Sequence, residues 1–182
     1  MERKYAFAAA LGGLVPSVLF IQELNAALER AQLPADCRAF LDAVFWLDAS
    51  AIYAHLRCMG ESGRVLHLAM YKLDLVVFPM VYGTLYFCAI AYLWPRVRVL
   101  RYAALATVCF DTLLENVGTV FLLRQFPERN ELVERCVSIG NRGKYVGLIA
   151  SMLLIVVGAL RRCLCSSPQR ADPRREEKTK AL

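Results

Sequence analysis

Histidine is scarce in this sequence, and the motifs of the common enzyme families are absent from it. The only two histidines are His55 and His67, which argues against a membrane hydrolase that gathers several histidines around zinc. The seven cysteines form no Cys-x-x-Cys pair, so their spacing signals neither a zinc site nor a disulfide framework. P-loops, dinucleotide fingerprints, nucleophilic triads and internal repeats are also missing. We therefore expect no metal and no cofactor, and no catalytic residue can be named.

Apolar residues, in contrast, are abundant. They make up 58% of the 182 residues, which is too many for a soluble domain of this size. A net charge of +6 would suggest nucleic-acid binding in a soluble domain, but here the basic residues lie beside apolar segments and in the tail. The topology rule of membrane proteins explains that placement better. The sequence predicts an integral membrane protein whose partner is the lipid bilayer and not a nucleic acid.

Four apolar segments are long enough to cross a bilayer, at residues 5–24, 73–94, 103–123 and 143–160. Arg3 and Lys4 before the first segment also fit a signal peptide, but the apolar run exceeds the usual signal core and no convincing cleavage site follows Phe20. Pro16 predicts a kink or a helix start within that segment. The expected fold is all-α, a four-helix transmembrane bundle over residues 1–160.

The first loop, residues 25–72, is polar but carries aromatic residues, which predicts short interfacial helices. Asp36 is a candidate N-cap for one piece, and Ser50 for another that ends at Gly60. Ser62 is then expected to begin a helix that continues into the second span. These helices are expected to lie on the membrane surface or over the mouth of the bundle.

Basic residues set the orientation of the bundle. The expected inner segments, 1–4, 96–102 and 161–182, hold 12 of the 22 Lys and Arg in 33 residues, and the outer loops hold fewer over a greater length. Both termini are therefore expected in the cytoplasm, with residues 25–72 outside. The tail, residues 161–182, is charged and rich in Pro, Arg and Glu, which predicts disorder.

The tail carries two short signals. Lys178 and Lys180 near the C-terminus resemble the K-x-K-x-x retrieval signal of endoplasmic reticulum membrane proteins, which works only on a cytoplasmic end. Cys163 and Cys165 follow the fourth span beside two arginines, which is the setting of reversible palmitoylation. We expect residence in the endoplasmic reticulum membrane.

The third span contains Asp111, Glu115 and Asn116 near its middle. A carboxylate at mid-bilayer costs about 2.5 to 3.5 kcal/mol, whereas each Leu, Ile, Val or Phe returns only about 0.3 to 0.6 kcal/mol. Such a helix needs neighbouring helices. Asp111 and Glu115 are four residues apart and share one face, which should point into the bundle. The pair either binds a ligand or handles protons, or it only holds helices together.

Other polar residues accompany these acids. Asp74 and Tyr82 share a face of the second span, His67 lies two turns earlier on nearly the same stripe, and Lys144 lies at the mouth of the fourth span. Asp74 is equally well explained as an interfacial residue that caps a helix or reaches the headgroups. The candidate ligand-binding residues are Asp74, Asp111, Glu115, Asn116, Tyr82, Lys144 and His67.

In a low dielectric these acids must pair with Lys144 or Arg64, take up protons, or meet a cationic ligand. Lys144 alone does not match all three acids. On the fourth span Gly143, Gly147 and Ser151 form a small-residue face that suits packing within the bundle or, alternatively, homodimerisation.

In architecture, and in the runs Pro16–Glu23 and Asp74–Pro79, the chain resembles the EXPERA group of four-span membrane proteins, which includes the sigma-2 receptor and a sterol isomerase, the emopamil-binding protein. The stretch from Gly60 to Tyr82, followed by Asp111 and Glu115, also resembles small four-span proteins of unassigned function. The EXPERA resemblance implies an intramembrane pocket for sterol-like or amine-bearing lipids. If the chain is an enzyme, the resemblance implies a sterol isomerase; a binding role is favoured.

Two other functions stay open. The polar face also suits a non-catalytic subunit or assembly factor that holds a partner membrane protein. Alternatively, exchange of protons at the acids suits a small proton-coupled transporter.

Overall fold

The computed structural model describes residues 44–75 and 77–165, together with isolated positions before them: Leu19, Gln22, Glu23, Ala26, Arg30, Cys37 and Leu41. Every regular element in this part of the chain is helical, which confirms the predicted all-α class. The first predicted span, the piece predicted to be capped by Asp36 and residues 166–182 of the tail lie outside the described residues, apart from the isolated positions.

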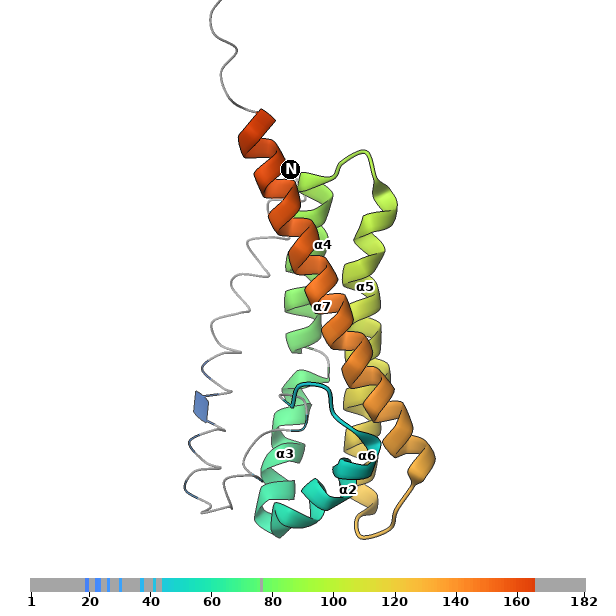
Figure 1. Ribbon diagram of the computed structural model, residues 1–182. Helices are drawn as coiled ribbons and strands as arrows, with labels where there is room; N and C mark the ends of the chain where they lie inside the picture. The colour runs from blue at the N-terminus through green and yellow to red at the C-terminus, as the bar shows by residue number, and fades with distance from the viewer. Residues whose placement is uncertain are drawn as a thin grey trace, which may run out of the picture.

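The helices run alternately along one long axis (Figure 1). Two short helices, α2 (Ala49–Cys58) and α3 (Gly60–Asp74), lie at one end, called here the α2 end, and α4 (Val77–Leu93) runs away from it. The chain returns through η3 (Arg98–Arg101), α5 (Tyr102–Cys109), the π-helical segment η4 (Phe110–Asn116) and α6 (Val117–Gln125), together called the α5–α6 rod. Helix α7 (Glu131–Cys165) then runs the length of the molecule.

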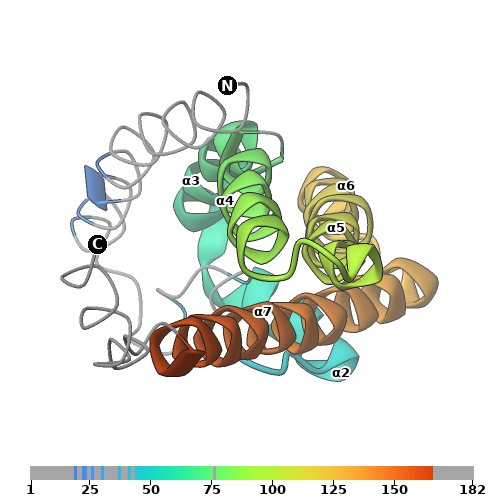
Figure 2. The ribbon, with the colours of Figure 1, turned by 90° about the horizontal axis from the view of Figure 1, so that it is seen from above.

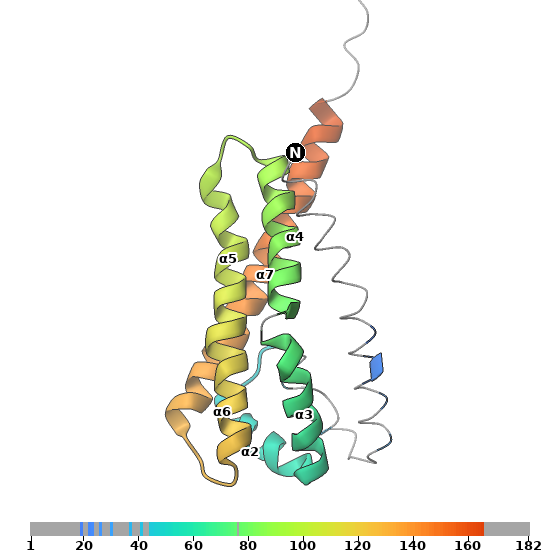
Figure 3. The ribbon, with the colours of Figure 1, turned by 180° about the vertical axis from the view of Figure 1, so that it is seen from behind.

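Helix α7 packs against both of the other long elements. Figure 3 shows α4 and the α5–α6 rod side by side, with α7 behind them, and Figure 2 shows α7 along one side of the pair. The chain direction makes α7 antiparallel to the rod and parallel to α4 (Figure 1). Any side chain that points inward from one of these three elements therefore faces the other two.

Two of these helices are long and apolar enough to cross a membrane: Arg98–Gln125, with 28 residues, and Glu131–Leu164, with 34. Helix Val77–Leu93 is apolar but shorter. The exposed large side chains of α7 are almost all apolar beyond Lys144, among them Val146, Ile149, Leu153, Val156 and Leu160. The apolar core of buried side chains instead gathers at the α2 end, where Ile52, Leu56, Met59, Tyr71, Leu122 and Val137 pack together.

The second predicted span differs from the structure at its start. We expected one helix from Ser62 through the span at 73–94, but α3 ends at Asp74 and α4 begins at Val77. Pro79 explains the break, because proline has no N–H to donate and its ring blocks the carbonyl four residues earlier. It is tolerated in the first turn of α4, where that N–H would have no helical partner. Asp74 therefore lies at a helix end and not in the interior of one long helix.

The short helices of the first loop also differ in detail from the prediction. Helix α2 begins at Ala49, with Asp48 in the cap position, and Ser50 lies inside the helix, where its Oγ donates to Asp48 Oδ2 over 2.8 Å. The helix ends at Cys58, and Gly60 adopts the left-handed φ of +64° that turns the chain into α3. Gly60 thus marks the predicted boundary between two helices.

Helix α7 starts well before the fourth predicted span at 143–160. Residues 131–142, predicted as part of a charged loop, are helical. Asn130 Oδ1 accepts from Val133 N over 3.2 Å, which caps the helix, and two acids in its first turn complement the helix dipole. Glu131 and Arg135 lie on the exposed side of this segment, while its buried side carries Glu134, Val137, Ser138 and Asn141.

A disulfide joins Cys37 to Cys58, with the two Cα atoms 5.8 Å apart. The cysteine spacing did not signal this pair, because a sequence separation of 21 residues matches no motif and pairing depends on where α2 lies in the fold. Cys163 is free and exposed on the last turns of α7.

Candidate functional site: a buried ionic cluster

The α5–α6 rod and α7 face each other with two lines of buried polar side chains. On the rod these are Thr107, Asp111, Glu115 and Thr119, each four residues after the one before, and all are at most 2% exposed. On α7 the line consists of Glu134, Ser138, Asn141, Lys144 and Ser151. Buried polar groups in such a position need hydrogen-bond or ionic partners within the protein.

Lys144 lies between the two carboxylates. Its Nζ is 2.8 Å from Glu115 Oε2 and 3.5 Å from Asp111 Oδ1, and the side chains are 5%, 0% and 2% exposed. Removing such charges from water costs several kcal/mol per ion, which only good pairing offsets. The two carboxylates share one ammonium group, so when both are ionised these three residues carry one net negative charge.

Tyr82 connects this cluster to α4. Its hydroxyl donates a hydrogen bond to Asp111 Oδ2, so Asp111 receives contacts from both α4 and α7. The Tyr82 ring lies edge-on to Phe78, with the ring centroids 5.7 Å apart, which fixes its direction. We call Tyr82, Asp111, Glu115 and Lys144, together with Asn141, the ionic cluster.

Asn141 joins the ionic cluster to the segment before α2. Its Nδ2 donates to Glu115 Oε1 over 2.8 Å and to Val44 O over 3.0 Å, while its Oδ1 accepts from Leu47 N over 2.8 Å. The Asn141 side chain is fully buried, and both its oxygen and its nitrogen have hydrogen-bond partners within the protein. Sequence reasoning missed Asn141, because its segment appeared to be a charged loop.

Small residues allow the two helices to approach closely enough for these contacts. A Cβ added at Gly140 would lie 2.5 Å from the backbone N of Glu115, and one at Gly147 would lie 2.2 Å from Thr107 Oγ1. A Cβ added at Gly143 would likewise lie 2.5 Å from the ring of Phe110. The small-residue face predicted on the fourth span therefore packs within the chain.

The remaining predicted residues lie near the cluster or beside it. Asn116 Nδ2 donates to the backbone O of Asp74 over 3.0 Å, which ties the end of α3 to η4. His67 is fully buried on α3, with its Nδ1 2.9 Å from Gly63 O and its ring 6.3 Å from that of His55. Arg64 stacks on the Phe126 ring at 4.1 Å, so Lys144 and not Arg64 is the base that meets the acids.

The ionic cluster lies on a π-helical segment. Segment η4 contains Asp111, Glu115 and Asn116, and all three are buried. The i→i+5 turn is rare and is found frequently at functional sites. It brings Asn116, which directly follows Glu115, into the interior beside α3.

No family model, curated protein or solved structure matches this chain.

Proposed function

We propose that the chain is a four-span protein of the endoplasmic reticulum membrane with both termini in the cytoplasm. Two helices of spanning length and the antiparallel order of α4, the rod and α7 support this arrangement. The apolar side chains exposed along α7 suit contact with lipid. Residues 5–24 supply the further span, and Lys178 and Lys180 supply the retrieval signal.

We propose that this protein binds a sterol-like or amine-bearing lipid at the ionic cluster. The observation that carries the proposal is that one lysine serves two buried carboxylates. Lys144 Nζ lies 2.8 Å from Glu115 and 3.5 Å from Asp111, so the amine of the ligand is expected at Asp111. A protonated amine on an apolar body supplies that charge and enters from the bilayer.

Proton-coupled transport is the second candidate. The hydrogen bond between Tyr82 and Asp111 favours it, because a hydroxyl group both gives and accepts a proton. The third function, holding a partner span, finds less support, since Asp111 and Glu115 are 2% and 0% exposed and face the protein interior.

Binding of sphingosine, compared with its uncharged N-acetyl derivative, tests the proposal in purified protein. We expect the wild type to prefer the amine, and Asp111→Asn to lose about tenfold or more in sphingosine affinity, since a charge-assisted contact contributes about 1.5 to 3 kcal/mol. Glu131→Gln, which removes an exposed acid of α7, is the matched control.

Thermal unfolding of each variant shows whether the protein is still folded. A folded Asp111→Asn protein that binds sphingosine like the wild type would refute the ligand site. Equal binding of the amine and the amide by the wild type would also refute it. Proton uptake lost in Asp111→Asn, without sphingosine binding in the wild type, would instead support transport.

A further inference from the structure

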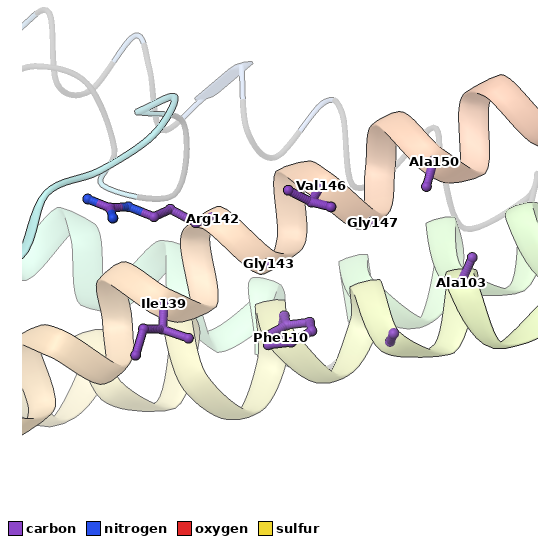
Figure 4. A pocket seen from close by; sticks show the side chains of 9 residues that line it. Ala103, Phe110, Ile139, Arg142, Gly143, Val146, Gly147 and Ala150 are labelled. Atoms are coloured by element: carbon purple, nitrogen blue, oxygen red, sulfur yellow. The ribbon is translucent and has the colours of Figure 1, made fainter.

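An apolar groove lies along the seam between α5 and α7, and no residue of the ionic cluster lines it. It has a volume of about 460 Å³ and is lined mostly by small residues, Ala103 and Ala106 on the rod and Gly143, Gly147 and Ala150 on α7. Figure 4 shows Ala103 on one of the two facing helices and Gly143, Gly147 and Ala150 on the other. Because the groove is formed by the two helices of spanning length, it opens toward the lipid of the proposed membrane.

Arg142 lies at the end of this groove nearest α2. In Figure 4 its side chain extends along α7, toward the N-terminal end of the helix, and not into the groove. Arginine side chains near the ends of apolar helices commonly extend in this direction, which places the charged group at the membrane interface. Ala150, eight residues further along, lies about 12 Å deeper at 1.5 Å per residue.

Aromatic side chains gather at the same level. Arg142 lies over the Trp46 ring at 5.7 Å, and the ring of Phe45 meets that of Tyr145 edge-on at 4.9 Å. Trp46 is 48% exposed and Phe45 is 63% exposed. Exposed aromatic rings beside a basic residue are typical of the headgroup level of a bilayer.

The backbone at Trp46 is strained. Trp46 has a φ of +59°, which is unfavourable for a large side chain. Its neighbour Leu47 is fixed on both sides, since its N–H donates to Asn141 and its carbonyl accepts from Ser138 Oγ over 2.8 Å. A strained conformation that is fixed so firmly favours a functional use of the exposed ring.

The guanidinium of Arg142 still has capacity for an anion. Its contact with Asp48 is long, 3.4 Å, and both side chains are largely exposed, at 42% and 64%. Its buried Nε has no acceptor among the described residues. A phosphate group is the anion that suits a guanidinium at the headgroup level.

We propose that the groove binds one glycerophospholipid, with an acyl chain between α5 and α7 and the phosphate at Arg142. This inference rests on the proposed membrane location but not on the ligand of the ionic cluster. The aromatic rings of Phe45 and Trp46 flank the headgroup. The lipid covers the apolar surface that α5 and α7 expose along this groove.

Native mass spectrometry of delipidated protein tests this inference, with phosphatidylglycerol as the probe and diacylglycerol, which has no phosphate, as the comparison. We expect one phosphatidylglycerol to be retained, with at least about tenfold preference over diacylglycerol. Arg142→Gln should remove this preference. Asp48→Asn is its matched control, because it breaks the same ion pair but keeps the guanidinium.

Ala106→Phe fills the groove from an exposed position and should abolish retention of both lipids, whereas Ala159→Phe, exposed elsewhere on α7, should not. A phosphatidylglycerol with a photoreactive acyl chain should crosslink to residues 103–110 or 139–150. Retention unchanged in both Arg142→Gln and Ala106→Phe would overturn the inference. Crosslinks confined to other segments would do the same, even if a variant fails to fold.

Discussion

At the scale of single residues, the stability of the interior depends on Lys144. It is the only base that contacts Asp111 and Glu115 among the described residues, and all three are nearly inaccessible to solvent. Buried ion pairs of this kind contribute little net stability when intact, but the loss of one partner leaves a buried charge uncompensated. Removing the lysine alone should therefore destabilise the protein more than removing the lysine and its carboxylate partner together.

Lys144→Met should therefore destabilise the protein by about 3 to 5 kcal/mol, since it removes the ammonium group that contacts two buried acids. Combining it with Glu115→Gln should recover part of the loss, because one of those acids is then neutral. Thermal unfolding in detergent measures both variants. If Lys144→Met unfolds at the wild-type temperature, the charges of this cluster are not coupled as the distances indicate.

The acids of this cluster could be found from the sequence, but the amide that supports them could not. Asp111 and Glu115 are predicted by their depth in an apolar segment and their spacing of four residues, and Lys144 as one of two candidate bases beside Arg64. Asn141 was not predicted, because it is a neutral residue in a polar, mixed-charge segment. Its burial therefore has no unfavourable free energy that the sequence alone would reveal. Its position facing Glu115 follows from the crossing of α7, which no local pattern specifies.

At the scale of the elements, the apolar periodicity predicted which helices exist, while tertiary contacts set their limits. Residues 103–123, predicted as the third span, lie within one continuous helix of spanning length, Arg98–Gln125. The π-helical η4 inside it was not foreseen, since its wider turn depends on packing against α7 and α3. Helix α7 extends to Glu131 because its polar residues repeat at helical spacing, a signal that the mixed charges concealed.

Gly140 tests how tightly α7 and η4 are packed. Gly140→Ala places a methyl group 2.5 Å from the Glu115 backbone N, and a backbone atom cannot move aside without displacing the helix. We expect a loss of about 1 to 3 kcal/mol, as for other overpacked interiors. Ile149→Ala, at an exposed position of the same helix, is the control and should change little. A Gly140→Ala protein as stable as the wild type would mean that the two helices lie further apart.

At the scale of the whole molecule, the two ends of the bundle differ in chemistry. The α2 end has a packed apolar core and the Cys37–Cys58 disulfide, whereas the far half of α7 exposes apolar side chains. Disulfides persist in oxidising compartments, so this bond favours a luminal position for the α2 end. The distribution of Lys and Arg independently predicts the same orientation.

Single-site glycosylation tests that orientation. Leu132 is 72% exposed at the α2 end, and Leu132→Thr places a threonine two residues after Asn130 to form an acceptor site. Glu177→Asn forms the corresponding site before Thr179 in the tail. If the α2 end is luminal, only the Leu132→Thr protein gains a glycan, and that glycan stays sensitive to endoglycosidase H because the protein remains in the endoplasmic reticulum. Adding Lys178→Ser and Lys180→Ser should then make it resistant, whereas a glycan on the tail site alone would invert the topology and remove the retrieval signal from the cytoplasm.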